Sequence, residues 1–155
     1  LKEIVEPNPS LPVTVGAVIA DLDPSWAGIP RSIEVAEELY RLPQVEIGCH
    51  TWSHPFDWGF FEHYTPESEI RYFPEYKFGV WTETNVDEDD QKNKMELLES
   101  EFKYPKEIHK GYDVPRAYAN QPYDLKREIE GSLNFLKNLT KDTGKLPQLM
   151  QWSGN

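Results

Sequence analysis

Three short segments of the chain carry the hydrophobic pattern of β-strands. Residues 11–20 are nearly all apolar and rich in β-branched side chains, as in a strand buried on both faces. In residues 44–50 the side chains alternate, so that Val45, Ile47 and Cys49 share one face of the strand. Residues 146–152 form the third segment. We therefore predict three short strands, widely separated along the chain.

Two segments between these strands have helical periodicity. Apolar residues recur at helical spacing within residues 33–40, Pro30 stands where a helix can begin, and Pro43 ends it. Asp124 is a good N-cap for a second helix from residue 125 to about residue 139. A strand, a helix and a second strand in succession favour a right-handed crossover between parallel strands. The pattern thus predicts an α/β fold with at least three parallel strands, adjacent in chain order.

Residues 55–123 interrupt this alternation as a long insertion rich in tyrosine, phenylalanine, tryptophan and proline. A segment of this length without obvious regular structure is usually functional or partly mobile. Residues 83–101 are strongly acidic, and we expect a solvated loop there with a short helix near residues 95–102. The acidic run at 87–90 lacks the alternating spacing and central glycine of a calcium loop. We interpret residues 1–155 as one domain with a long insertion.

Composition excludes several classes of partner. Lys and Arg total 16 against 27 Asp and Glu, which gives a formal net charge of −11. Such a chain lacks the cations that would replace counterions on nucleic acid, and an anionic membrane surface would repel it. Its apolar segments are too short to span a bilayer. We therefore expect neither a nucleic-acid partner nor membrane insertion, and the single cysteine, Cys49, excludes an internal disulfide and a multi-thiolate metal site.

The candidate chemistry centres on residues 46–55, which read Glu-Ile-Gly-Cys-His-Thr-Trp-Ser-His-Pro. His50 and His54 can bind one divalent cation if the chain turns between them. His50 stands at the carboxyl end of a predicted strand, where α/β folds bind ligands. Two loop histidines that are hydrogen-bonded to backbone are the structural alternative. If the pair binds zinc, its ring nitrogens should lie within about 3 to 4 Å of each other or of a common point.

This ten-residue segment resembles the second motif of polysaccharide deacetylases of the NodB-homology type, carbohydrate esterase family 4. The wider pattern, with the helix around residues 128–132 and the strand ending at residues 151–155, is most similar to the atypical deacetylase domain of Pel-type exopolysaccharide systems. The resemblance implies a (β/α) barrel, incomplete here, whose catalytic Zn²⁺ or other divalent transition metal is held by His50 and His54. It also implies removal of N-acetyl or O-acetyl groups from an N-acetylated hexosamine polymer, in a periplasmic or secreted location.

Other parts of the family's pattern are missing. Its first motif is a strand ending in two aspartates, the general base and the third metal ligand, and should precede Leu1. Asp21 and Asp23 resemble this pair in composition only, and helix capping or loop shaping is their structural alternative. The third motif, Arg-x-Pro-Tyr, is not found at residues 152–154, and the catalytic acid would follow Asn155. We therefore expect a piece of a longer enzyme that binds zinc weakly and is inactive on acetylated sugars by itself.

Aromatic residues supply the candidates for sugar binding. Trp52 and Trp58 flank the histidine motif and are the better candidates to stack on a sugar ring, with core or loop packing as the alternative. His63 and His109 have no partner at ligand spacing, so we expect solvated or structural roles for both. Two other functions stay open. One is a catalytically inactive barrel domain that binds a glycan or a partner protein through the insertion, and the other is an acidic protein-interaction domain without metal.

Overall fold

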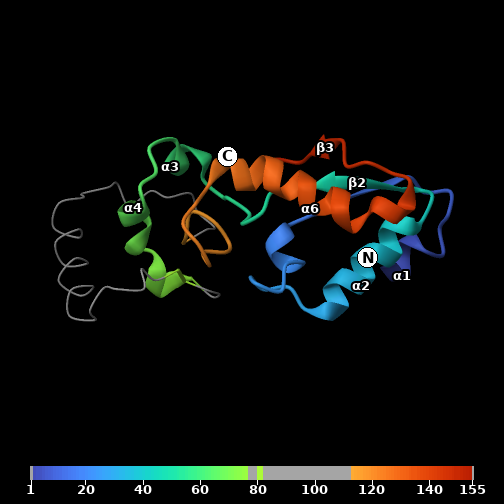
Figure 1. Cartoon of the computed structure of the whole chain (residues 1–155), viewed down its shortest axis with the longest axis horizontal. Helices are drawn as coiled ribbons and strands as arrows, with labels where there is room; N and C mark the ends of the chain where they lie inside the picture. The colour runs from blue at the N-terminus through green and yellow to red at the C-terminus, as the bar shows by residue number, and fades with distance from the viewer. Residues whose placement is uncertain (1, 77–79, 82–112, 155) are drawn as a thin grey trace. The chain divides into compact units, whose positions relative to one another are not determined.

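The computed structural model describes residues 2–76, 80–81 and 113–154. The chain divides into two compact units, one of residues 1–54 with 124–153 and the other of residues 55–123 with 154–155. The boundaries after residues 54 and 123 coincide with those of the predicted insertion. Figure 1 shows the elements of each unit. The acidic loop and the short helix expected within residues 83–102 lie outside the described residues.

The first unit is built on a three-stranded parallel sheet with the order β1-β2-β3. β1 covers Val13–Ala17, β2 covers Val45–Cys49, and β3 is the short strand Leu149–Met150. Cys49 lies between Ala17 and Met150 in the register, so the carboxyl ends of the strands meet at one edge. The predicted order and parallel direction are confirmed, although each strand is shorter than its apolar segment. Within the described residues the sheet is open, with β1 and β3 at its edges.

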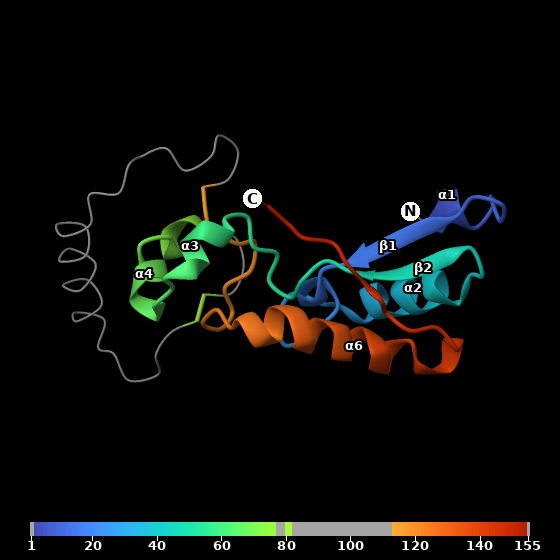
Figure 2. The ribbon, with the colours of Figure 1, turned by 90° about the horizontal axis from the view of Figure 1, so that it is seen from above.

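Two helices cover one face of this sheet. α2 covers Pro30–Arg41, with Pro30 at its first position as predicted, and α6 covers Ser132–Leu139. Figure 2 shows both helices on the same side of the sheet. The connections β1–β2 and β2–β3 each lead to the neighbouring strand on the same side. Two right-handed crossovers of this kind place their helices on the same face of the sheet.

The core of the first unit lies between β2 and the two helices. Val45, Ile47 and Cys49 are 2%, 1% and 0% exposed, whereas Glu46 on the other face is exposed, which confirms the predicted alternation. Burial raises the pKa of the Cys49 thiol, as expected for a small buried residue. The short helix α1 (Lys2–Val5) adds a valine to this cluster. The inward-facing members of the cluster from the helices are Leu39, Tyr40 and Leu136.

The second predicted helix is confirmed, but it contains a π turn. Asp124 Oδ1 accepts a hydrogen bond from the backbone N–H of Arg127 at 2.6 Å, as an N-cap should. The π turn η3 (Arg127–Gly131) then precedes α6. After α6 the chain passes through the 3₁₀ turn η4 (Lys141–Thr143) to Gly144, whose φ of 73° is left-handed. π turns are frequent at functional sites, and this one carries Glu128.

Lys145 joins the segment before β3 to the connection between α2 and β2. Its Nζ donates to the carbonyl oxygens of Tyr40, Leu42 and Val45 at 2.9, 2.5 and 2.7 Å. A helix leaves its last carbonyls without intrahelical partners, and a cation there also complements the helix dipole. The lysine therefore caps α2 from a distant part of the chain.

The second unit contains two short helices that the hydrophobic pattern does not predict. α3 covers Trp58–Glu62 and α4 covers Pro66–Ile70, followed by the 3₁₀ turn η2 (Phe73–Glu75). Local caps start both helices, since Asp57 accepts from the backbone of α3 and Thr65 forms a capping box in α4. The sequence predicts no obvious regular structure in residues 55–123, and α3 and α4 correct that prediction for residues 58–70. Helices this short show no 3.6-residue period.

A buried ion pair organises the second unit. Arg116 and Glu69 are both 0% exposed, and Arg116 Nε and Nη2 donate to the Glu69 carboxylate at 2.6 and 2.7 Å. The hydroxyls of Tyr64 and Tyr76 and Nε1 of Trp81 donate to the same carboxylate. A buried charge is tolerated only when it is paired and hydrogen-bonded in this way. The network therefore fixes α4 to the segments around residues 81 and 116.

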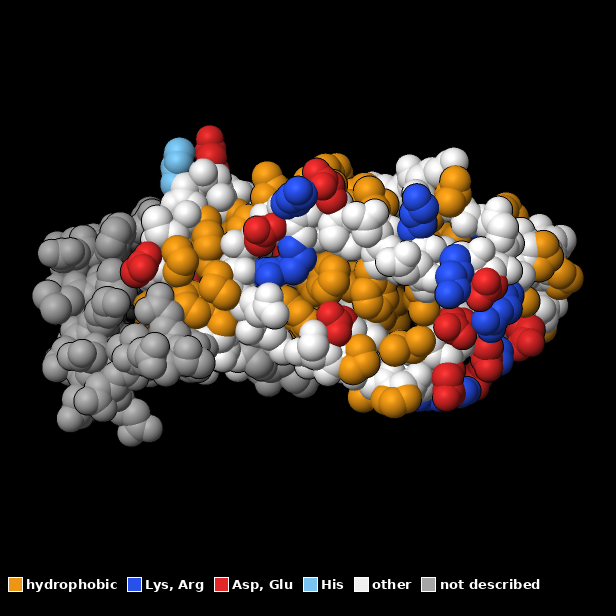
Figure 3. Space-filling model, viewed as in Figure 1, with side chains coloured by type: hydrophobic (Ala, Val, Ile, Leu, Met, Phe, Trp, Pro, Cys, Tyr) orange, Lys and Arg blue, Asp and Glu red, His pale blue; other side chains and the backbone are white. Residues whose placement is uncertain are grey.

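The outer surface of the first unit carries charges of both signs. The ion pair Lys2–Glu38 joins α1 to α2, and Arg41 pairs with Glu37 within α2. Figure 3 shows acidic and basic side chains interleaved over these helices, without a patch of one sign. Among the helices that the structure describes, none has the length and hydrophobicity needed to cross a bilayer.

Candidate metal centre

The histidine motif forms a loop at the carboxyl end of β2. The backbone N–H of His50 donates to the carbonyl of Ala17 at 2.8 Å. The carbonyls of Thr51 and Trp52 accept from the N–H groups of Ile19 and Ala20 at 3.0 and 2.9 Å, at the start of the 3₁₀ turn η1 (Ile19–Asp21). These bonds hold the loop against the segment that follows β1.

Two residues of this loop have left-handed backbone. Thr51 has a φ of 66° and His54 a φ of 56°. This region is uncommon for any residue but glycine, and a β-branched threonine is especially disfavoured, at a cost of about 1–3 kcal/mol each. Four residues of extended strand would separate the two histidines by about 13 Å. The two strained residues instead turn the chain so that the imidazoles converge.

The two imidazoles face each other through their Nε2 atoms, which are 3.0 Å apart. The predicted proximity of the ring nitrogens is confirmed. Nδ1 of His50 lies 2.8 Å from the backbone carbonyl oxygen of Gln151. A carbonyl only accepts hydrogen bonds, so Nδ1 carries the proton and Nε2 of the neutral ring presents its lone pair to His54. A donor set of this kind suits a divalent transition metal.

Gln151 is placed by the third strand. Its N–H donates to the carbonyl of Cys49 at 2.7 Å, which fixes the carbonyl that holds His50. Its side chain lies over Gly16 of β1, where a Cβ would stand 1.7 Å from Oε1 of Gln151. The glycine therefore leaves space for a polar side chain at the edge where the strands end.

Glu128 fixes the middle of the loop. Its side chain is 0% exposed, Oε2 accepts from the backbone N–H groups of Trp52 and Ser53 at 2.9 and 2.8 Å, and Oε1 accepts from Ser53 Oγ at 2.7 Å. Charge-assisted hydrogen bonds of this kind are stronger than neutral ones. Sequence reasoning gives this glutamate no role, because a buried acid and an exposed acid look the same in a helical pattern. Glu128 acts on the histidines by positioning their loop.

The environment of His54 favours its neutral form. Burial lowers the pKa of His54, the neighbouring His50 lowers it further, and the carboxylate of Asp21 opposes both effects. The result is a pKa below the ordinary value of a histidine. Metal binding requires a neutral imidazole, so this shift keeps the ring available as a ligand at neutral pH.

The two candidate aspartates occupy different surroundings. Asp21 is an exposed residue at the end of η1, and its charge acts on His54. Asp23 Oδ1 accepts from the N–H of Ser25 at 2.8 Å, which is the loop-shaping role given above as its structural alternative. Within the described ranges, no group of three or more histidine, cysteine and acidic side chains could hold a metal ion. Among the described residues, the candidate centre therefore consists of the two converging imidazoles of His50 and His54.

The two candidate tryptophans lie in different units. The Trp52 ring is half-buried, with its centroid 6.3 Å from that of Trp26 and 5.8 Å from that of Phe135. Its ring edge also lies against Gly131 of the π turn. Trp52 thus packs the loop onto the helix, while Trp58 is the first residue of α3 in the second unit. His109 lies outside the described residues.

No known protein family, curated protein or solved structure matches this chain. The class of protein that the fold and the loop define is an α/β protein with a histidine pair at the carboxyl edge of a parallel sheet.

Proposed function

We propose that this chain belongs to a metal-dependent polysaccharide deacetylase, in which His50 and His54 bind Zn²⁺ or another divalent transition metal. The observation that carries the proposal is the 3.0 Å approach of the two Nε2 atoms, with Nδ1 of His50 held by a backbone carbonyl. Metal-ligating histidines almost always donate their other ring N–H to a carbonyl, a carboxylate or water. The structural alternative also accounts for the bond to the Gln151 carbonyl, so the support for a shared ligand comes from the convergence of the two Nε2 atoms.

The residues present fit the metal. The loop is fixed on three sides by the segment after β1, by Glu128 and by Gln151, so the imidazoles are held before any ion arrives. Catalytic zinc sites use three protein ligands and keep one position open. In this proposal His50 and His54 supply two of the three, and the resemblance to the deacetylases implies an aspartate as the third. The same resemblance implies that Asp21 is a weaker candidate for catalysis than an aspartate of the first motif.

The proposed chemistry is hydrolysis of an acetyl group on an N-acetylated hexosamine polymer. When bound, the metal would polarise the acetyl carbonyl and lower the pKa of a bound water molecule. His50 and His54 hold the ion in this proposal, the Gln151 carbonyl orients the His50 ring, and Glu128 keeps the loop in its strained form. A periplasmic or secreted location is part of the same proposal, because the substrate is an exopolysaccharide.

The incomplete (β/α) barrel is also proposed. Three adjacent parallel strands with two helices on one side are compatible with one sector of such a barrel. The second face of the sheet, with Glu46 and Gly48, would then face the interior of the barrel. The carboxyl edge, where barrels carry their active sites, is the edge that holds the histidine pair.

Zinc titration of the 155-residue chain tests the proposal. Competition with a chromophoric chelator should show one equivalent of Zn²⁺ bound, and His50→Ala or His54→Ala should weaken binding by at least about 10–100-fold. His63→Ala is the matched control, because His63 lies outside this loop. The zinc affinity of this variant should equal that of the unaltered chain. Equal zinc affinity in all four proteins would contradict the proposal.

A further inference from the structure

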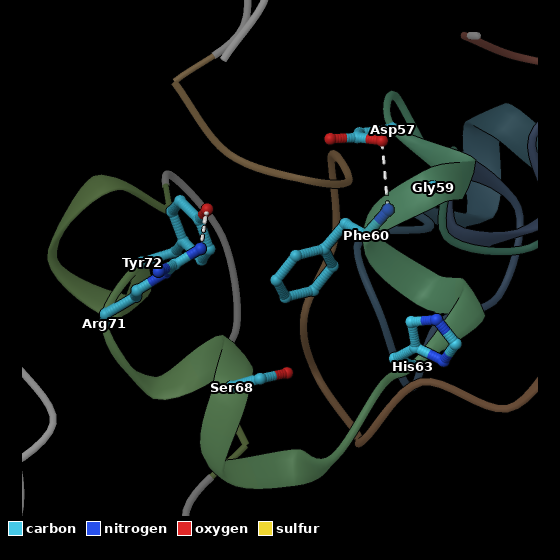
Figure 4. A pocket seen from close by; sticks show the side chains of 7 residues that line it. All are labelled: Asp57, Gly59, Phe60, His63, Ser68, Arg71 and Tyr72. Carbon is cyan, nitrogen blue, oxygen red and sulfur yellow. Dashed lines mark hydrogen bonds between the residues drawn. The ribbon is translucent and has the colours of Figure 1, made fainter. Parts of the chain in front are cut away.

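The second unit contains a pocket of about 240 Å³ between α3 and the end of α4. Figure 4 shows the Phe60 ring reaching into its middle, with His63 on the side of α3 and Arg71 and Tyr72 on the opposite side. Seven residues line the pocket: Asp57, Gly59, Phe60, His63, Ser68, Arg71 and Tyr72. All of them belong to one compact unit.

The walls of this pocket are held rigidly. The ring centroids of Phe60 and Tyr72 are 5.5 Å apart in an edge-to-face arrangement. Tyr64, which follows α3, donates to the buried carboxylate of Glu69 in α4 at 3.0 Å. The capping box of Thr65 and Ser68 fixes the turn between the two helices. A site that is formed in advance loses little entropy when it binds a ligand.

The polar groups of the pocket are of opposite charge and are oriented by their neighbours. Asp57 Oδ1 accepts from the backbone N–H of Phe60 at 3.0 Å, and a carboxylate has further acceptor sites. Arg71 Nη2 donates to the Tyr72 hydroxyl at 2.6 Å, and its guanidinium lies 4.6 Å from the centroid of the Tyr72 ring. The exposed imidazole of His63 adds a third group that can donate or accept.

We infer that this pocket binds a single uncharged sugar ring of a glycan. Aromatic walls pack against the C–H face of a pyranose, while planar carboxylate and guanidinium groups bond to neighbouring hydroxyls. Asp57 would repel an anionic ligand and Arg71 a cationic one, so a neutral ligand satisfies both. The volume lies below the roughly 300–1,000 Å³ of pockets for drug-sized ligands, which suits one ring.

This inference goes beyond the proposed hydrolase, because the pocket uses neither His50 nor His54 and needs no metal. It also gives His63 a role other than the structural or solvated one expected from the sequence. Glycan binding through the insertion is the alternative function that the sequence leaves open, and the pocket supplies residues for it. A chain can therefore carry both properties, or either one alone.

The test is isothermal titration calorimetry, in which the tetramer of N-acetylglucosamine is titrated into the full chain in the presence of EDTA. We expect saturable binding that is weakened about tenfold or more in Asp57→Asn, Arg71→Gln and Phe60→Leu, since these remove the carboxylate charge, the guanidinium and the aromatic ring respectively. Asp57→Asn keeps a residue that can cap α3, and Phe60→Leu keeps an apolar side chain of similar size. Glu62→Gln is the matched control, an exposed residue of α3 that does not line the pocket, and should bind as the unaltered chain does.

A second variant separates this inference from the proposed function. The double variant His50→Ala/His54→Ala should bind the tetramer normally, although it has lost zinc. The inference is overturned if the unaltered chain does not bind the tetramer, or if Arg71→Gln and Asp57→Asn, checked for folding by circular dichroism, bind as tightly as Glu62→Gln. Displacement of the tetramer by millimolar acetate or phosphate would show an anion site and would overturn it too.

Discussion

At the scale of single residues, the histidine pair depends on which proton each ring carries. Nδ1 of His50 donates to the carbonyl oxygen of Gln151, so the neutral ring is the tautomer that carries its proton on Nδ1 and has a lone pair on Nε2. His54 is half-buried and faces that lone pair. A proton shared between the two Nε2 atoms and a metal bound by both are therefore competing states of one site.

The first prediction concerns the pH dependence of His54. Burial and the neighbouring His50 lower the pKa of His54 in the folded chain, whereas an unfolded histidine titrates near pH 6.5. The unfolded chain thus binds more protons between the two values, and stability rises with pH in that interval. The stabilising effect of His54 is complete above about pH 6.5 and is lost as the pH falls towards the folded value.

Proton NMR of the metal-free chain measures this directly. The imidazole signals of His54, assigned by comparison with His54→Asn, should titrate with a midpoint below about 6.5. In urea unfolding with EDTA, the unaltered chain should lose more stability between pH 7 and pH 5 than His54→Asn does. A His54 midpoint at or above that of a free histidine would contradict the described environment.

The second prediction concerns Glu128. In Glu128→Gln the carboxylate charge is lost and an amide NH₂ replaces one acceptor oxygen, so the charge-assisted hydrogen bonds from Trp52 and Ser53 become weaker neutral ones. We expect a loss of about 1–3 kcal/mol in the free energy of unfolding and a 10–100-fold loss in zinc affinity. Chemical denaturation and the chelator competition measure the two effects.

Lys145→Met is the matched control for this variant. It removes a donor to three carbonyls of the α2–β2 connection and should cost a similar amount of stability, about 1–3 kcal/mol. None of these three bonds of Lys145 reaches the histidine loop. The zinc affinity of Lys145→Met should therefore stay within about twofold of that of the unaltered chain. If both variants lose zinc affinity equally, Glu128 has no specific positioning role.

At the scale of elements, local signals account for what the sequence predicts well. Pro30 and Asp124 mark the starts of the two longer helices, and alternation in residues 44–50 identifies the buried face of β2. Order and direction of the strands follow from the crossover rule. The four-residue spacing of His50 and His54 at the carboxyl end of a predicted strand marks the histidine pair in the sequence.

The remaining features of the site arise from contacts between distant segments. The left-handed Thr51 follows no sequence rule, because its cost is offset by bonds to residues 19 and 128. The π turn places Glu128 beneath the loop, and a helical pattern does not reveal a π turn. The carbonyl of Gln151 is a backbone atom, so its residue type carries no signal.

The third prediction tests the buried ion pair that joins α4 to the segment around Arg116. Arg116→Met leaves the fully buried carboxylate of Glu69 without its cation. Breaking a buried pair by removing one partner costs about 3–5 kcal/mol. The Trp81 side chain donates to the same carboxylate. The unfolding transition seen in its fluorescence should therefore shift to a lower urea concentration in Arg116→Met.

A comparison with Lys126→Met provides the reference for that measurement. Lys126 and Glu130 form an exposed pair at 3.8 Å, and exposed pairs contribute about 0–1 kcal/mol. An unfolding midpoint in Arg116→Met equal to that of Lys126→Met would show that the buried network does not stabilise the second unit.

At the scale of the whole molecule, each unit carries one proposed site. The first unit holds the histidine pair at the edge of its sheet, and the second holds the pocket between α3 and α4. Each unit also has its own cluster of buried apolar residues. Metal binding and sugar binding can therefore be tested separately in the same chain.

The fourth prediction concerns activity at this scale. Hydrolysis of an N-acetyl group needs a metal, a base for the water proton and an acid for the leaving nitrogen, and a missing base or acid costs a factor of about 10²–10⁴. On the proposed resemblance to the deacetylases, neither the base nor the acid is expected among residues 1–155. We expect no acetate release from N-acetylglucosamine oligomers with added zinc. Turnover that His50→Ala abolishes would contradict this and would direct attention to Asp21 and Asp23.

The central claim is that His50 and His54 bind one metal ion through Nε2. Histidine ¹⁵N spectra of the full chain during zinc titration test it most directly, because they distinguish the two ring nitrogens of each residue. We predict that Nε2 of both histidines changes on zinc binding, while Nδ1 of His50 keeps its proton and its bond to the Gln151 carbonyl. Unchanged spectra, or zinc bound through Nδ1 of His50, would contradict the claim.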